Sequence, residues 1–109
     1  MTDPGPPARR VVAYVPDLMD RSKLLAVVPG ARIVRAPAEL GPLDTAATVV
    51  VDLSRPGALD LVDTAVTAGA RVLAFGSHVD RVLLDAAAAR GAQVLARSAF
   101  FSRLGELLG

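Results

Sequence analysis

The chain has 109 residues, a formal net charge of +1 and no cysteine. This length is typical of one domain, and the missing cysteines exclude disulfides and cysteine-ligated metals. The small net charge argues against strong attraction to nucleic acid or to an anionic membrane, so neither is expected as a partner. Hydrophobic residues make up 52% of the chain and aromatic residues 4%, so the core must consist mainly of Val, Leu and Ala. A reducing, cytoplasmic setting fits this composition.

Residues 1–9 contain three prolines and no apolar run. They predict a disordered tail rather than a signal peptide or a membrane anchor. No later stretch approaches the roughly 18 consecutive apolar residues of a membrane span. We therefore expect a single domain over residues 10–109.

The first predicted strand covers residues 11–15 and is stopped by Pro16, which cannot donate to a sheet ladder. Asp17 then follows as the N-cap of a helix over residues 18–28. Helical spacing turns three apolar residues of this helix toward the core, namely Leu24, Leu25 and Val28. It lets three charged residues face water, namely Asp20, Arg21 and Lys23.

A short pattern occurs three times, at residues 30–34, 69–73 and 91–95. Each copy begins with Gly-Ala and continues directly into an apolar run. The glycine suits the left-handed stop of a helix, and the apolar run suits a strand. The alternative is a coincidence of a composition rich in Ala, Arg and Gly.

Between the second strand and Thr48, the pair Gly41-Pro42 allows only a short or broken helix. The beta-branched run from Thr48 to Val51 then predicts a strand buried on both faces, with Asp52 at its carboxyl end. Three further helices are expected at residues 59–68, 79–90 and about 100–108. The second of these has Val79, Val82, Leu83 and Ala86 at helical spacing.

Five strands that alternate with about five helices predict an α/β fold with a parallel sheet. The economical arrangement is a flavodoxin-like, doubly wound sheet with strand order 2-1-3-4-5 and helices on both faces. In this order the ends of strands 1 and 3 are neighbours at the switch point. Asp17 and Asp52, which are distant in sequence, should therefore lie close together.

Two carboxylates at such an edge can share a hard cation such as Mg²⁺, which prefers oxygen ligands. We take Asp17, Asp52 and the nearby Ser54 as candidate ligands. Asp52 could then act as a nucleophile toward phosphorus.

In this layout the chain resembles bacterial response-regulator receiver domains, over nearly all of residues 10–108. Asp17 matches the second acid of the pair that ends strand 1 in that family. Asp52 matches the phosphoacceptor, and Pro56 matches the proline four residues later. The resemblance implies a Mg²⁺ cofactor, phosphorylation from a histidine kinase and signalling through protein contacts.

The chain also departs from that family. Pro16 stands in place of the first acid, and Gly76 stands in place of the hydroxyl residue, with Ser77 one position later. Arg97-Ser98 replaces Lys-Pro, and arginine keeps the charge but not the compact ammonium geometry. The resemblance still makes Arg97 the anion partner and Ser77 the hydroxyl switch. With one acid missing, we expect weak Mg²⁺ binding and an atypical receiver, or pseudo-receiver, that is phosphorylated weakly or not at all.

Each candidate residue also has a purely structural interpretation. Asp17 could serve only as a helix cap, Asp52 could only close the turn after its strand, and Ser77 and His78 could be ordinary loop residues. There is no Gly-x-Ser-x-Gly elbow for a Ser-His-Asp triad, and there is no phosphate-loop motif.

The sequence thus favours a stand-alone receiver-like signalling domain, because no effector domain follows. Its output would pass through a protein partner or a homodimer, formed on the fourth helix and the last strand and helix, as receivers use that face. Two alternatives remain. One is a structural interaction module of the same fold without phosphotransfer. The other is a small-ligand binder or enzyme that uses the same crevice, which a sizeable apolar pocket would favour.

Overall fold

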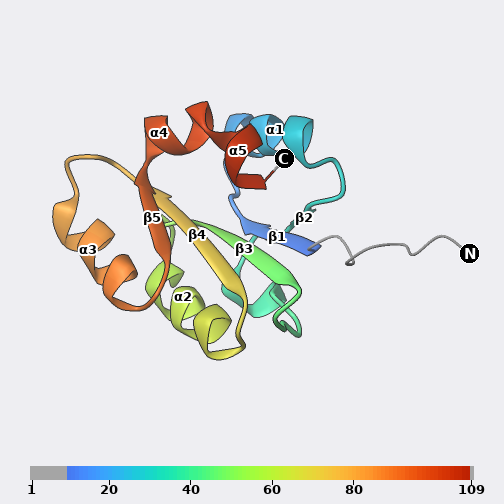
Figure 1. The fold of residues 1–109 in the computed structure, drawn as a ribbon, viewed down its shortest axis with the longest axis horizontal. Helices are drawn as coiled ribbons and strands as arrows, with labels where there is room; N and C mark the ends of the chain where they lie inside the picture. Colours follow the sequence, from blue (N-terminus) through green and yellow to red (C-terminus); the bar gives the residue numbers. More distant parts are fainter. Residues whose placement is uncertain (1–9, 109) are drawn as a thin grey trace, which may run out of the picture.

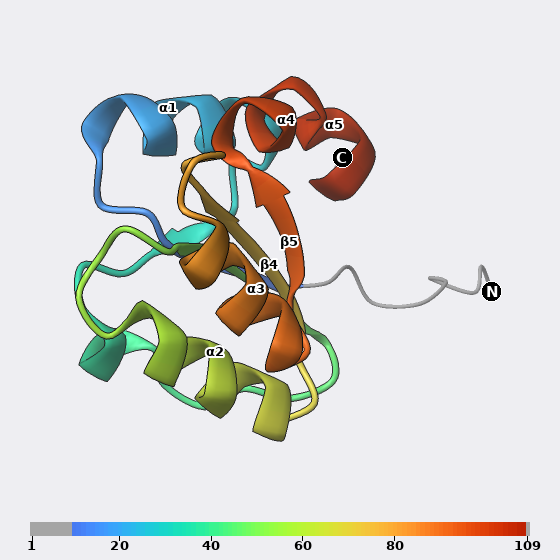
Figure 2. The ribbon, with the colours of Figure 1, turned by 90° about the vertical axis from the view of Figure 1, so that its left-hand side faces the viewer.

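The computed structural model describes residues 10–108, and the predicted tail, residues 1–9, lies outside them. Figures 1 and 2 show three layers, with α1, α4 and α5 on one face of a central sheet and α2 and α3 on the other. The strands are β1 (Arg10–Tyr14), β2 (Arg32–Ile33), β3 (Ala47–Asp52), β4 (Arg71–Gly76) and β5 (Gln93–Ala96). The helices are α1 (Leu18–Val27), η1 (Pro37–Glu39), α2 (Ala58–Thr67), α3 (Arg81–Ala89), α4 (Arg97–Ser102) and α5 (Leu104–Leu108).

The sheet has the strand order β2-β1-β3-β4-β5, and every pair of neighbouring strands is parallel, which confirms the predicted flavodoxin-like arrangement. β3 is central, and all six of its residues are buried. A strand covered by helices on both faces needs apolar side chains at every position, and this explains the continuous Val49–Val51 run. β1 and β3 are neighbours, so their carboxyl ends meet at one edge of the sheet.

Each face of the sheet packs into its own core. On the α2 and α3 side the core is mainly aliphatic, with Val49, Val51 and Leu61 among its members and Tyr14 as its aromatic residue. On the other side Phe75 stacks on Phe100 at a ring-centroid distance of 4.7 Å. Within residues 10–108 no helix is both long enough and apolar enough to cross a bilayer.

Two of the three Gly-Ala repeats stop their helices as predicted. Gly69 and Gly91 have φ angles of 83° and 102°, in the left-handed region where a side chain is strained. The first repeat differs, because Gly30 does not take a positive φ and the strand after it has only two residues. The η1 turn confirms that only a short helix forms after β2.

The helix predicted at residues 79–90 forms, but two of the apolar residues at helical spacing, Val79 and Val82, do not lie on its buried face. α3 begins at Arg81, with Asp80 as its N-cap, and its buried residues are Leu84 and Ala87. Val79 and Val82 are 75% and 83% exposed. Asp80 accepts a hydrogen bond from the backbone N–H of Leu83, and this cap sets the start of the helix two residues later than the apolar spacing indicated.

The last predicted helix, at about residues 100–108, is two helices that meet at Arg103. α4 begins at Arg97 directly after β5, so Arg97 and Ser98 form the first turn of a helix. The position of Arg97 at the carboxyl edge of β5 brings its side chain toward the ends of β1 and β3.

Candidate functional site

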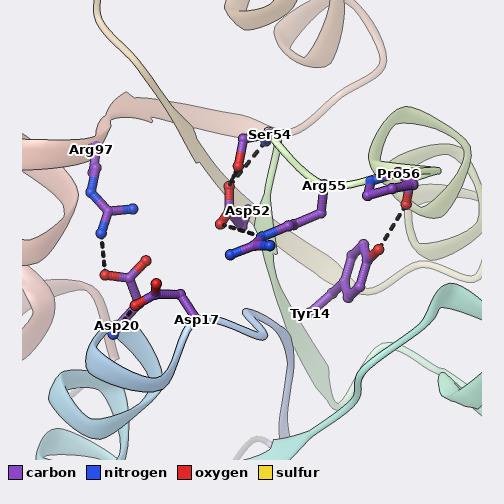
Figure 3. Close-up of polar contacts among 8 residues, drawn as sticks. All are labelled: Tyr14, Asp17, Asp20, Asp52, Ser54, Arg55, Pro56 and Arg97. Carbon is purple, nitrogen blue, oxygen red and sulfur yellow. Dashed lines mark hydrogen bonds and ion pairs between the residues drawn. The ribbon is translucent and has the colours of Figure 1, made fainter.

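A crevice lies at the carboxyl edge of the sheet, where β1 and β3 end. Figure 3 shows the carboxylates of Asp17, Asp20 and Asp52 around the guanidinium groups of Arg55 and Arg97. The charges of all three acids raise the pKa of Arg97, so they lie within electrostatic range of one guanidinium. The connectivity of the sheet thus brings Asp17 and Asp52 to one site, as the strand order required.

Asp17 is the N-cap of α1, as predicted. Its Oδ1 accepts a hydrogen bond of 3.0 Å from the backbone N–H of Asp20. This bond is the largest cause of a lowered pKa of the Asp17 carboxyl, with further lowering from the N–H of Met19 and the charges of Arg97 and Arg55. Asp17 is therefore an ionised carboxylate of which one oxygen is already used by its own helix.

Asp52 is buried, and its carboxylate is bonded within its own turn. Its Oδ1 accepts hydrogen bonds from the backbone N–H and the hydroxyl of Ser54, at 3.0 and 2.7 Å. Its Oδ2 lies 3.4 Å from Nε of Arg55. The hydroxyl of Tyr14 donates to the carbonyl of Pro56 at 2.8 Å and ties this turn to β1. Asp52 thus closes the turn, as its structural interpretation requires, and its role as a phosphoacceptor stays a prediction.

The prediction that Asp20 faces water is wrong. Asp20 is 1% exposed, and its Oδ1 accepts a hydrogen bond from Nη2 of Arg97. Its other oxygen, Oδ2, is buried and has no hydrogen-bond partner among residues 10–108. Helical spacing contained the information needed, since Asp20 lies four residues before the predicted core residue Leu24 and so shares its face. The charge of Asp20 led to the wrong prediction of an exposed side chain, because an unpaired carboxylate is rarely buried.

Arg97 is held by its neighbours on two sides. The hydrogen bond to Asp20 is the largest cause of a raised pKa of its guanidinium, and the charges of Asp20, Asp52 and Asp17 add to it. The guanidinium also lies over the rings of Phe101 and Phe75, at 5.3 and 5.8 Å from their centroids. Because the side chain remains 48% exposed, it still faces solvent while it is anchored.

A pocket of about 300 Å³ opens beside Asp52 and Arg97, with Phe75 and Gly76 at its back. Its polar lining comes from the ends of β3 and β4 and the start of α4, namely Asp52, Ser54, Ser77, His78, Arg97 and Ser98. Ser77 thus lies in the same pocket as Asp52 and Arg97. Its Oγ accepts a long hydrogen bond of 3.4 Å from the backbone N–H of Val79, and its hydroxyl donates to no group within residues 10–108.

The donor set of the crevice fits a divalent cation poorly. Three carboxylates share the space with two guanidinium groups, which cancel two of the three negative charges. A Mg²⁺ ion bound to Asp52 would have to displace Arg55 from Oδ2. Within the described residues, no three acidic or histidine side chains are arranged as metal ligands. The roles assigned to Asp17, Asp52 and Ser54 in metal binding stay predictions.

The sequence was compared with protein-family models and with curated proteins, and no family model and no curated protein matches it.

Proposed function

We propose that this chain is an atypical receiver-like signalling domain that acts through protein contacts. Three features support this function. The sheet order places Asp17 and Asp52 in one crevice. Ser77 and Arg97 lie in the pocket beside Asp52. The turn after Asp52 is tied to β1 through Pro56. This is the layout that the resemblance to receivers implies.

The observation that carries the proposal is the internal pairing of the charged groups. Arg97, the expected anion partner, is bonded to Asp20, and both oxygens of Asp52 accept hydrogen bonds from its own turn. An incoming phosphoryl group needs a free carboxylate oxygen on Asp52, and it needs a cation whose charge is not already offset, as Asp20 offsets that of Arg97. We therefore expect phosphotransfer to Asp52 to be weak.

Mg²⁺ binding should be weak for the same reason. The affinity of such a site rises with the summed charge of its carboxylates, and Arg55 and Arg97 reduce that sum here. Pro16 supplies no carboxylate, and Asp20, the third acid present, already holds Arg97. A cation at this edge would compete with two guanidinium groups.

We place the protein contacts on α3 and β5. Val79 and Val82 project into solvent before and within α3, and a groove of about 170 Å³ runs between α3 and the edge strand β5, lined in part by Leu84 and Val94. Exposed large apolar residues beside a groove are typical of protein-binding surfaces. Figure 2 shows α3 on one face of the sheet and α4 and α5 on the other, and β5 is the edge strand between them. A homodimer through α3, β5 and the last helices would use this edge.

A second candidate is an interaction module that has lost phosphotransfer altogether. The two Asp–Arg pairs favour it, because they stabilise one state of the crevice without any added group. The two candidates differ in whether any phosphoryl group reaches Asp52.

Intact-mass measurement after incubation with acetyl phosphate and Mg²⁺ tests the proposal. We expect a phosphoryl adduct on a small minority of molecules, which disappears in Asp52→Asn and persists in the control Asp60→Asn, an exposed acid in the first turn of α2. No adduct at all would favour the second candidate. Nearly complete modification of the wild type would contradict the proposal, and an adduct that persists in Asp52→Asn would remove the site assignment.

A further inference from the structure

The pocket between the ends of β3 and β4 and the start of α4 has more hydrogen-bond donors than the protein itself uses. We propose that it binds a small organic carboxylate with a compact apolar body, without covalent change. This ligand requires neither phosphotransfer nor a protein partner, so the inference stands apart from the proposed function.

Arg97 supplies the principal donor. A guanidinium has five N–H groups, and among residues 10–108 Arg97 donates one side-chain hydrogen bond, from Nη2 to Asp20. In Figure 3 the other terminal nitrogen points toward Asp52 and Ser54, which line the pocket. A carboxylate in the pocket could therefore bind Arg97 while the Asp20 pair stays intact.

Three further side chains of the lining have unused donors. The hydroxyl of Ser98 and the ring of His78 have no hydrogen-bond partner among residues 10–108, and Ser77 acts only as an acceptor, toward Val79. These groups come from the loop after β4 and from the first turn of α4, which also carries Arg97. Donors that converge on one pocket favour a ligand with acceptor oxygens.

The walls set the size and the apolar part of the ligand. The pocket volume of about 300 Å³ is at the lower end of the range for small-molecule sites, so the ligand must be compact. Phe75 is among the lining residues but is fully buried, and its ring lies 5.8 Å from the guanidinium carbon of Arg97. An apolar group attached to the carboxylate would lie next to this residue.

The charge of Asp52 favours a bound carboxylate over a bound phosphate. Its carboxylate lines the same pocket and repels an incoming anion, and this repulsion grows with the charge of the ligand. Arg55 offsets it only in part, at 3.4 Å. A singly charged, planar carboxylate also matches the fork of a guanidinium in two parallel hydrogen bonds. The pocket should therefore prefer it to a phosphate dianion.

Titration of the ¹⁵N-labelled protein with benzoate, followed by amide spectra, tests the inference. Benzamide has the same shape without the charge, and inorganic phosphate has the charge without the ring. We expect benzoate to shift the amide signals of Ser77, His78 and Ser98 in a saturable way, with a Kd of about 1 mM or below. The other two compounds should bind at least about tenfold more weakly. Absence of saturation, or equal binding of benzamide or phosphate, would overturn the inference.

Two variants locate the binding. Arg97→Gln should abolish benzoate binding, but it also leaves Asp20 without its partner. The double variant Ser77→Ala/Ser98→Ala keeps that ion pair and should weaken benzoate binding by roughly a hundredfold or more, since each lost hydroxyl removes a hydrogen bond to a charged group. Ser102→Ala is the matched control, because this α4 hydroxyl bonds to Ala99 outside the pocket. Unchanged affinity in the double variant would place the benzoate elsewhere and refute the assignment.

Discussion

Asp20 and Arg97 lie 77 residues apart in the chain and form an ion pair that joins the first turn of α1 to the first residue of α4. Asp20 is almost fully buried, whereas its neighbours Leu18 and Met19 are exposed. The helix therefore turns a charged residue inward and two apolar residues outward at this point. Such an inversion is stable only because the guanidinium of Arg97 compensates the buried charge.

Arg97→Gln should lower the free energy of unfolding by about 1–3 kcal/mol, because it leaves the Asp20 carboxylate buried without a cation. The loss should fall short of that for a fully enclosed pair, since the side chain of Arg97 is half exposed. Urea denaturation measures it. Arg103→Gln, which breaks an exposed pair with Glu106, serves as the control and should change stability by less than about 1 kcal/mol. Equal losses in the two variants would contradict the account of Asp20.

The N-cap carboxylate of Asp17 gives stability a specific dependence on pH. Its pKa in the folded protein is lowered from 3.8, chiefly by the N–H of Asp20. Its contribution is therefore fully present above that ordinary value and is lost as the pH falls through the lowered pKa. Asp17→Ser keeps a capping oxygen that does not titrate. The wild type should lose stability relative to this variant in urea denaturations below about pH 4, and a constant difference across pH would refute the assignment.

Tyr14→Phe should lower the free energy of unfolding by about 1 kcal/mol, because it removes the hydrogen bond from a buried hydroxyl to the carbonyl of Pro56. The amide signals of residues 54–58 should shift, since this bond ties the turn after Asp52 to β1. Chemical denaturation and amide spectra measure the two effects. A variant with unchanged stability and unchanged amide signals in that turn would show that the bond does not hold it.

Two substitutions test which residues of α3 face the core. Val82→Ser should change stability by less than about 0.5 kcal/mol, because this side chain is exposed. Leu84→Ala should cost about 2–4 kcal/mol, because Leu84 is buried against the aliphatic core. Thermal or urea denaturation compares them. A larger loss of stability in Val82→Ser than in Leu84→Ala would show that Val82 faces the core, as the apolar spacing of the sequence indicated.

The elements set by local patterns could be predicted from the sequence. The Val49–Val51 run indicated a strand covered on both faces, and Gly69 and Gly91 marked the helix stops before β4 and β5. The alternation of strands and helices predicted the parallel sheet, and the choice of a flavodoxin-like arrangement predicted its order and hence the common crevice of Asp17 and Asp52.

Features that depend on tertiary contacts could not be predicted in this way. Helical spacing from Leu24 indicated the face of Asp20, but Arg97, the partner that stabilises its buried charge, lies 77 residues later in the chain, and no local pattern contains it. The start of α3 is different, because the Asp80 cap that sets it is a local contact with Leu83, which the apolar spacing obscured. The bonding of Asp52 to Arg55 depends on the geometry of the turn that Tyr14 holds.

The most direct test of the central claim, that the protein neutralises its own acidic crevice, is a Mg²⁺ titration of the wild type and Arg55→Gln followed by amide spectra. Removal of Arg55 frees Oδ2 of Asp52 and restores one negative charge. The account predicts that the wild type binds Mg²⁺ weakly and that the variant binds it at least about tenfold more tightly. A tenfold difference in Kd corresponds to about 1.4 kcal/mol of binding free energy. Equal affinities, with tight binding already in the wild type, would contradict it.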